Sequence, residues 1–183
     1  MSASNTADTE AKIRDLRARV RDVPDFPKRG ILFRDLTPLM GHGPSMRTCI
    51  ELLAARVAHH APDVIVAIES RGFIFGAPVA AALGVGFAPV RKPGKLPWQT
   101  RSRSYALEYG TYSLEMHADA VRPGSRAVIV DDLLATGGTA AATAELIREQ
   151  GAHVIACAFT VELAALNGRG RLGDALIESL IVY

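Results

Sequence analysis

The chain has 183 residues, of which 49% are hydrophobic and 22% are charged, a composition typical of a folded globular protein. Its 21 Lys and Arg residues against 19 Asp and Glu residues leave a formal net charge of +2, which is too small to indicate a general nucleic-acid-binding surface. No apolar run approaches the roughly 18 residues of a membrane span, the first ten residues lack the pattern of a secretory signal, and two cysteines are too few for a disulfide framework. We therefore expect one cytoplasmic domain over residues 1–183, without nucleic-acid or membrane partners.

The N-terminal part predicts a helix followed by an extended segment. Residues 1 to about 10 are small and polar and are expected to form a frayed tail. From Ala11 to Arg21 the apolar residues recur at helical spacing, which predicts an amphipathic helix that ends before Pro24. The segment 25–35 then combines Phe and Ile side chains with turn residues. It is either a cover strand pinned to the core or an aromatic surface on which a flat heterocycle stacks.

The rest of the chain alternates apolar strands with helical patterns. Helices are predicted from Pro44 to about His60, through Gly76 to Leu83, and from the alanine-rich run after Thr139 to Gln150. Buried strands are predicted at Val64–Ile68, Val85–Val90, Ala127–Val130 and His153–Val161, with a return strand at Thr111–Met116 and an edge strand at Ala175–Tyr183. This order predicts an α/β fold with a mostly parallel twisted sheet flanked by helices.

The run RAVIVDDLLATGGTAAAT at 126–143 carries the most specific chemical signal. It reads as a strand, an acid pair, a glycine turn and a helix N-terminus, where unsatisfied N–H groups and the helix dipole favour a phosphate. Asp131 and Asp132 would repel that phosphate, so they are expected to serve sugar hydroxyls or a divalent cation. The run is neither a Walker A loop nor a dinucleotide fingerprint. It therefore predicts a site for a phosphorylated sugar.

A second strand-turn-helix junction follows Val64–Ile68 and contains Glu69, Ser70 and Arg71. Arg71 either clamps pyrophosphate oxygens in bidentate fashion or pairs with Glu69. Farther along, residues 91–104 contain five basic residues and an exposed-looking Trp98 without regular periodicity. A connection of that length predicts a functional lid, with a solvated charged loop as the alternative.

The string VDDLLATGGT resembles the PRPP (phosphoribosyl pyrophosphate) signature of the type I phosphoribosyltransferase family, and it is similar to the adenine-specific branch of that family. The resemblance extends from about Asp25 to Leu163. It implies a Rossmann-like type I fold in which residues 11–40 form the N-terminal helix and a base-binding hood, and residues 92–108 a flexible catalytic loop. It also implies Mg²⁺ as cofactor and a homodimer, with Trp98 and the N-terminal helix as contact points.

Site residues carry over position by position from this resemblance. It implies a catalytic role for Glu108, pyrophosphate binding by Glu69, Ser70, Arg71, Lys92 and Lys95, and adenine binding by Leu32, Phe33 and Arg34. The phosphate and ribose of PRPP or AMP would contact Asp131, Asp132, Ala135, Thr136, Gly137, Gly138 and Thr139, with Mg²⁺ held through PRPP and water near the two acids.

The implied reaction is PRPP plus adenine to AMP and pyrophosphate, a purine salvage step. Two alternatives remain open. One is a transferase of the same class for another base, such as hypoxanthine, xanthine or orotate, against which the Phe33-Arg34 pair argues. The other is a non-catalytic PRPP-sensing regulator, although Glu108, Arg71 and Lys95 form the complete set that a catalyst needs.

Overall fold

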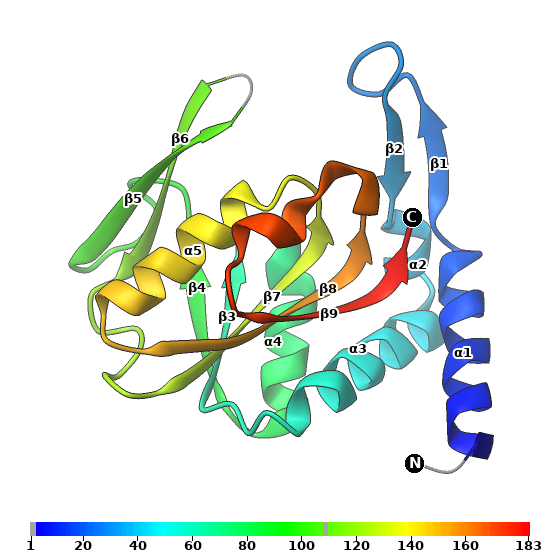
Figure 1. Cartoon of the computed structure of the whole chain (residues 1–183), viewed down its shortest axis with the longest axis horizontal. Helices are drawn as coiled ribbons and strands as arrows, with labels where there is room; N and C mark the ends of the chain where they lie inside the picture. The colour runs from blue at the N-terminus through cyan, green and yellow to red at the C-terminus, as the bar shows by residue number, and fades with distance from the viewer. Residues whose placement is uncertain (1–2, 108–109) are drawn as a thin grey trace. The chain divides into compact units, whose positions relative to one another are not determined.

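The computed structural model describes residues 3–107 and 110–183 (Figure 1). By contacts the chain divides into two compact units, Met1–Leu52 and Leu53–Tyr183, which are described separately below. Whether they act as the single domain expected from the sequence stays a prediction. Among the described residues, no helix combines the length and apolar character that a membrane crossing requires.

The first unit contains a helix and a β-hairpin. Its elements are α1 (Ala3–Arg17), β1 (Arg21–Pro24), β2 (Leu32–Asp35), α2 (Thr37–Met40) and the beginning of α3 (Gly43–Ala58). Helix α1 begins earlier than the expected start at Ala11, so residues 3–10 are helical where a frayed tail was expected. The ion pair between Lys12 and Asp8, one helical turn apart, supports this earlier start.

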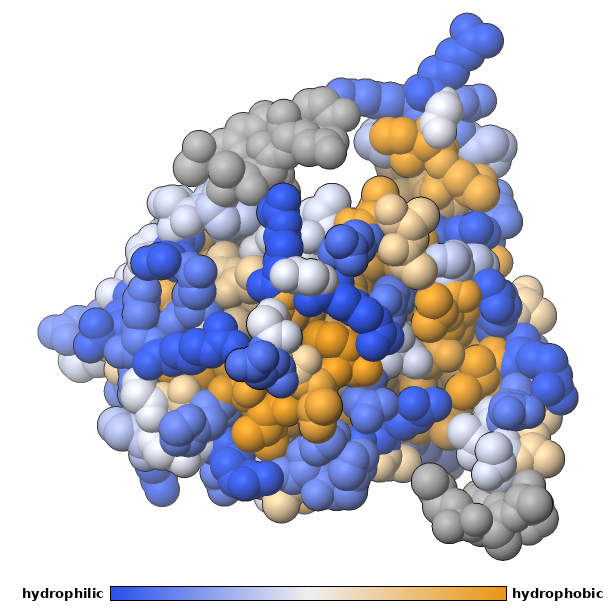
Figure 2. All heavy atoms as spheres, viewed as in Figure 1, coloured by the Kyte–Doolittle hydropathy of each residue, from blue (hydrophilic) through white to orange (hydrophobic). Residues whose placement is uncertain are grey.

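The hairpin of β1 and β2 is antiparallel and places Val23 opposite Phe33. The ring of Phe33 packs edge-on against Phe26, with ring centroids 5.1 Å apart. Phe26 and Leu32 remain about half exposed, and Figure 2 shows apolar surface on this hairpin below its polar loop. The hairpin thus exposes aromatic and apolar side chains, and the stacking of a flat heterocycle on it stays a prediction.

The second unit is built on a five-stranded sheet in the order β4-β3-β7-β8-β9, in which every neighbouring pair is parallel. The strands are β3 (Val64–Ile68), β4 (Gly86–Val90), β7 (Arg126–Leu134), β8 (His153–Glu162) and β9 (Leu176–Val182). The predicted parallel sheet with a C-terminal edge strand is confirmed. The apolar runs of β3 and β7 are buried because these strands lie in the interior of the sheet.

Helices α4 (Arg71–Leu83) and α5 (Gly138–Glu149) cover opposite faces of this sheet (Figure 1). On β3, Ala67 faces α4, where a Cβ at Gly76 would lie only 2.5 Å from the Ala67 Cβ. Val66, one residue earlier, points the other way and belongs to the core cluster that includes Leu146 of α5. The chain thus winds outward from β3 in one direction and from β7 in the other, so the topological switch point lies between these two strands.

A second hairpin, β5 (Thr100–Leu107) and β6 (Gly110–His117), is antiparallel and packs on α5. The prediction of an irregular connection up to Ser104 was therefore wrong from Thr100 onward. Arg103 explains part of the difference, because its guanidinium reaches both Glu145 and Glu149 on α5. These contacts are far apart in sequence and leave no periodic signal.

Two short 3₁₀ turns, η1 (Ala164–Leu166) and η2 (Gly168–Arg171), connect β8 to β9. Helix α3 ends at Ala58, before the chain turns into β3. Its last residues belong to the second unit, where Arg56 pairs with Glu178 of β9 at 3.1 Å.

Candidate active site

A pocket of about 490 Å³ opens at the carboxyl ends of β3 and β7, on both sides of the switch point. This is the edge at which open α/β sheets bind ligands. Eleven of its lining residues were predicted from the sequence: Glu69, Ser70, Arg71, Lys92, Asp131, Asp132, Ala135, Thr136, Gly137, Gly138 and Thr139. Residues 69–71 and 131–139, about 60 residues apart in sequence, therefore form one site together with Lys92.

The loop between β7 and α5 has the geometry of an anion site. Gly137 caps α5 with a φ of +78°, a conformation that glycine adopts without strain. The first hydrogen bond of the helix runs from the Ala141 N–H to the Gly137 carbonyl, so the N–H groups of residues 138–140 have no partner within the helix. The hydroxyls of Thr139 and Tyr105 lie 3.3 Å apart beside this loop. The loop therefore offers backbone and hydroxyl donors to an anion.

Behind this loop lies the η2 turn. A Cβ on Gly137 would lie 2.3 Å from the Gly168 carbonyl oxygen, and a Cβ on Gly168 would lie 2.3 Å from the Ala135 carbonyl oxygen. Arg169 in the same turn binds both oxygens of Glu162 at 2.6 and 2.7 Å. Because Glu162 is the last residue of β8, this bidentate pair ties the turn to the sheet.

The acid pair lies at the floor of the pocket. The Asp132 N–H donates to Asp131 Oδ1 at 2.9 Å, and Arg71 Nε lies 2.9 Å from Asp132 Oδ2. Burial raises the pKa of Asp131 well above its usual range, and the neighbouring charge of Asp132 raises it further. Burial also raises the pKa of Asp132, although Arg71 opposes the shift. Burial therefore raises the pKa of both carboxyls, and the shift is the larger one at Asp131.

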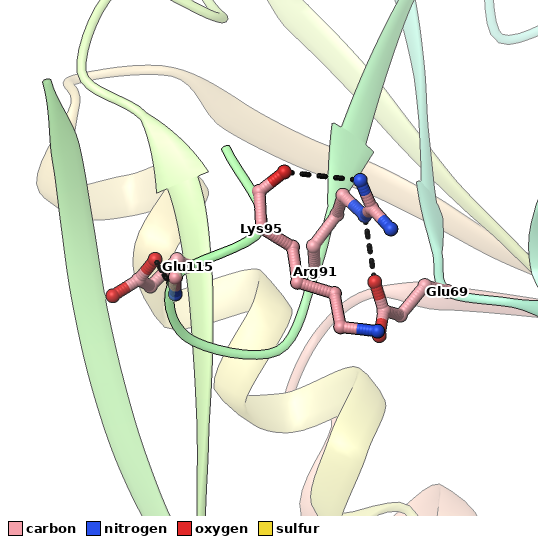
Figure 3. Close-up of polar contacts among 5 residues, drawn as sticks. Glu69, Arg91, Lys95 and Glu115 are labelled. Atoms are coloured by element: carbon pink, nitrogen blue, oxygen red, sulfur yellow. Dashed lines mark hydrogen bonds and ion pairs between the residues drawn. The ribbon is translucent and has the colours of Figure 1, made fainter. Parts of the chain in front are cut away.

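Glu69 is paired from the other side of the pocket. Arg91 Nε donates to Glu69 Oε2 at 2.6 Å, and Lys95 Nζ lies 3.6 Å from Oε1 (Figure 3). Burial by itself would raise the pKa of Glu69, but the hydrogen bond from Arg91 and the charge of Lys95 lower it below its usual range. Arg71 itself forms an ion pair with Asp132, whereas Glu69 forms ion pairs with Arg91 and Lys95.

Glu115 of β6 holds in place the start of the segment 91–104, which contains the five basic residues. Arg91 and Glu115 exchange two backbone hydrogen bonds of 2.9 and 2.7 Å, and the Glu115 carboxylate accepts the Gly94 N–H at 3.0 Å (Figure 3). The Arg91 guanidinium in turn donates to the Lys95 carbonyl at 3.0 Å. This anchoring places Lys92 in the pocket wall.

The carboxylate oxygens of Asp131 and Asp132, which line the pocket, suit a hard divalent cation. Mg²⁺ prefers oxygen ligands and is usually bound through one or two carboxylates together with substrate phosphates and water. Asp132 Oδ2 is buried and accepts no hydrogen bond from the part of the chain described here, although Arg71 lies beside it as an ion-pair partner. The acid pair therefore fits a Mg²⁺ ion that is held mainly by the substrate.

Four other predicted residues lie outside this pocket. Lys95 contacts the pocket through Glu69. Leu32, Phe33 and Arg34 lie on β2 of the first unit, where Arg34 pairs with Asp22. Glu108, the predicted catalytic residue, lies outside the described residues.

Sequence reasoning did not assign Arg91, Tyr105 or the η2 turn to the site. Arg91 was visible only as one of five basic residues, and nothing local indicated that its partner would be Glu69. The turn around Gly168 and Arg169 carried a usable signal, since Gly, Arg and Asn cluster at 167–173 directly after a strand.

Comparison with known proteins identifies the family to which this pocket belongs. Residues 39–172 match the phosphoribosyl transferase domain family. The adenine phosphoribosyltransferase of Rhodospirillum centenum is 56% identical over 169 residues, covering 92% of this chain and 98% of the relative. The chain belongs to the adenine phosphoribosyltransferase family. The member from Anaeromyxobacter dehalogenans is 52% identical over 168 residues, again covering 92% of this chain and 98% of the relative.

Solved structures of adenine phosphoribosyltransferases have the same fold. The crystal structure from Thermoanaerobacter pseudethanolicus superposes with a TM-score of 0.91 at 51% identity, covering 93% of this chain and 99% of that one. The enzyme from Saccharomyces cerevisiae, complexed with an imino-altritol bisphosphate and adenine, gives a TM-score of 0.90 at 38% identity, covering 93% and 99%. The predicted type I phosphoribosyltransferase fold is confirmed.

Proposed function

We propose that this protein transfers the 5-phosphoribosyl group from PRPP to adenine, producing AMP and pyrophosphate. The observation that carries the proposal is the meeting of a helix-N-terminal anion loop, the acid pair Asp131 and Asp132, and two cationic side chains, Arg71 and Lys92, in one pocket. A phosphorylated sugar that also carries a pyrophosphate needs this combination. The adenine phosphoribosyltransferase relatives support adenine as the base.

The 5′-phosphate is assigned to the loop from Ala135 to Thr139. Its backbone N–H groups and the positive end of the α5 dipole attract the phosphate dianion. The hydroxyls of Thr136 and Thr139 add further donors, and the absence of side chains at Gly137 and Gly138 lets phosphate oxygens approach the backbone.

The ribose is assigned to Asp131 and Asp132. Burial raises the pKa of both carboxyls, and the charge of Asp132 raises that of Asp131 further. The two hydroxyls of a ribose ring can donate hydrogen bonds to the carboxylate oxygens of this pair. Mg²⁺ bound with PRPP near these acids would supply positive charge to the pyrophosphate.

The pyrophosphate is assigned to the residues from Glu69 to Arg71 together with Lys92 and Lys95. Arg71 lies against Asp132 and Lys95 against Glu69, so both cationic side chains lie beside the proposed position of the pyrophosphate group of PRPP. We expect pyrophosphate to draw both cations toward itself. The carboxylates of Asp132 and Glu69 then hold these side chains in place before the substrate binds, which limits the reorganisation on binding.

The reaction is a displacement at the anomeric carbon, which passes through an oxocarbenium-like state as at other glycosidic centres. The bond to the pyrophosphate oxygen breaks while a ring nitrogen of adenine forms the new bond. Catalysis requires neutralisation of the departing pyrophosphate, alignment of the base, and exclusion of water. Glu108 is assigned the proton exchange with the purine ring, and closure of residues 92–108 the exclusion of water.

The base is assigned to the hood residues Leu32, Phe33 and Arg34. The Phe33 ring is held edge-on by Phe26, which leaves an aromatic face for a flat purine. The exposed hairpin residue Leu32 offers backbone groups for the edge of the base.

The decisive experiment is AMP formation from PRPP and labelled adenine with Mg²⁺, run in parallel with hypoxanthine, guanine and orotate. We expect turnover with adenine alone. Turnover with another base would overturn the assigned specificity. PRPP binding without turnover on any base would indicate that the protein is a non-catalytic PRPP sensor, and the fold assignment would not change.

We also propose that the protein is a cytoplasmic homodimer. Trp98 is 66% exposed and is therefore accessible to a second subunit. Light scattering coupled to size-exclusion chromatography checks the mass in solution. A Trp98→Ser variant that remains dimeric would exclude Trp98 as an essential contact.

A further inference from the structure

A cluster of nitrogen and oxygen ligands lies away from the active-site pocket, where α3 passes into β3. It consists of His59, His60 and Glu178, whose candidate ligand atoms all lie within 4.8 Å of one another. The two histidines follow the end of α3, and Glu178 lies on the edge strand β9. We propose that these three side chains form a second metal site, which takes a borderline transition-metal ion such as Zn²⁺.

The central ligand of this site is His60. Its Nε2 atom is buried and has no hydrogen-bond partner within the described residues. Glu178 Oε1 faces it at 3.8 Å, which is too long for a hydrogen bond. Buried polar atoms in folded proteins are nearly always paired, and a bound cation is one partner that satisfies such an atom.

The other contacts orient the two ligands that come from α3 and β9. Arg56 NH1 donates to Glu178 Oε2 at 3.1 Å, so only Oε1 is directed at His60. Arg126 donates to the carbonyl oxygens of His60 and Ala61, which fixes the backbone that carries the imidazole. Partners of this kind around metal ligands hold them in position.

The donor set selects the class of metal. Two imidazoles and one carboxylate are typical of Zn²⁺ and related ions, whereas Mg²⁺ and Ca²⁺ prefer oxygen ligands alone. Atoms bound about 2.1 Å from a tetrahedral Zn²⁺ lie about 3.4 Å apart, so ligand atoms that lie up to 4.8 Å apart need to approach by up to about 1.4 Å. The His59 ring contacts the His60 ring, with centroids 3.8 Å apart, and because His59 is exposed its side chain can rotate to make this adjustment. Three protein ligands leave a fourth position for water.

The cluster is separate from the pocket that binds PRPP in the proposed function. Glu178 pairs with Ala158 near the beginning of β9, whereas the pocket lies beyond the carboxyl ends of β3 and β7. In a parallel sheet, the beginnings of the strands and their carboxyl ends lie at opposite ends of the sheet. The metal-site inference therefore does not depend on the proposed activity and can be tested without it.

The test is Zn²⁺ binding by isothermal titration calorimetry on chelator-treated protein, with Mg²⁺ in excess so that all-oxygen sites are already occupied. We expect one saturable Zn²⁺ per chain. His60→Ala and Glu178→Gln are each expected to weaken binding at least tenfold. The matched control is His153→Ala, because His153 is an exposed histidine outside the cluster. The Zn²⁺ affinity of this variant should stay within about twofold of the wild type.

A second measurement on the unaltered protein guards against variants that fail to fold. Zn²⁺ is expected to shift the imidazole NMR signals of His59 and His60 and to leave those of His153 in place. Absence of saturable binding would overturn the proposal. So would binding that survives both substitutions, or imidazole shifts at His153 alone, since either would identify the ion as adventitious.

Discussion

Gly137 and Gly168 face each other so closely that neither has room for a side chain. The Gly137 Cβ position lies 2.3 Å from the Gly168 carbonyl oxygen, and that of Gly168 lies 2.3 Å from the Ala135 carbonyl oxygen. The η2 turn is thus the rear wall of the anion loop. Its backbone sets the position of the N–H groups that are proposed to bind the 5′-phosphate.

The first prediction is that Gly168→Ala raises the KM for PRPP at least tenfold while kcat changes less. The added methyl group forces the turn and the loop apart, an overpacking that costs roughly 1–3 kcal/mol of stability. Gly170→Ala is the matched control, because its Cβ would meet its nearest neighbour, Asn167 Nδ2, at an ordinary 3.5 Å. Steady-state kinetics with adenine saturating checks both variants. Equal KM values for them would refute the supporting role of the Gly168 turn.

A second prediction concerns the stability that Glu162 contributes through Arg169. The Arg169 hydrogen bond is the main reason that the pKa of Glu162 lies below its usual range, in spite of its burial. A carboxyl whose pKa is lowered by folding stabilises the protein above the unfolded-state pKa of 4.5 and loses this contribution as the pH falls through the folded-state value. Glu162→Gln should therefore cost roughly 1–3 kcal/mol at pH 7, a range for charged hydrogen bonds, toward its lower end because Arg169 is half exposed.

The measurement for Glu162 is urea unfolding of wild type and variant between pH 3 and 7. The difference in free energy of unfolding should shrink steadily toward low pH. Glu149→Gln serves as control, since Glu149 pairs with Arg103 while remaining 40% exposed and surface pairs contribute little. A difference for Glu162→Gln that does not depend on pH would show that packing, and not the charge, carries the effect.

The parallel sheet and the anion loop could be predicted from the sequence because their signals are local. The apolar run before Asp131 and the glycines after it lie within one segment, and strand, turn and helix follow from residue order alone. The partner of Arg71 could not be predicted in this way. Glu69 is two residues away, but α4 begins at Arg71 and directs its side chain to Asp132 on another strand.

The same distinction explains the missed residues. The Arg91–Glu69 pair and the Tyr105–Thr139 contact each join segments that are more than 20 residues apart. Only the folded sheet brings these segments together. Strand β5 was missed for a related reason, since its arginines alternate with small polar residues and gain their order from α5.

A third prediction addresses Arg71. Arg71→Gln should weaken pyrophosphate binding at least tenfold, because a bidentate cationic donor is lost from the pocket. The same change should raise the pKa of Asp132 further, since the charge of Arg71 is what holds this pKa down against burial. Calorimetry with pyrophosphate and Mg²⁺ measures the first effect, and carboxyl NMR titration the second. Arg122→Gln, an exposed arginine outside the pocket, should leave both unchanged. If pyrophosphate affinity is also unchanged in Arg71→Gln, the assigned role of Arg71 is wrong.

The last prediction tests Glu108, whose assignment comes from the family resemblance. If its carboxylate exchanges a proton with the purine ring, Glu108→Gln should lower kcat by about 100-fold or more, within the range of general acid–base catalysis. PRPP affinity should stay within a few-fold of the wild type, because the anion loop, the acid pair and Arg71 are all intact. Pre-steady-state AMP formation together with PRPP titration separates the two quantities. Glu145→Gln, on the exposed side of α5, controls for a general change in charge. Full turnover in Glu108→Gln would move the proton transfer to another group, and Asp131, whose pKa is raised well above its usual range, would be the next carboxyl to substitute.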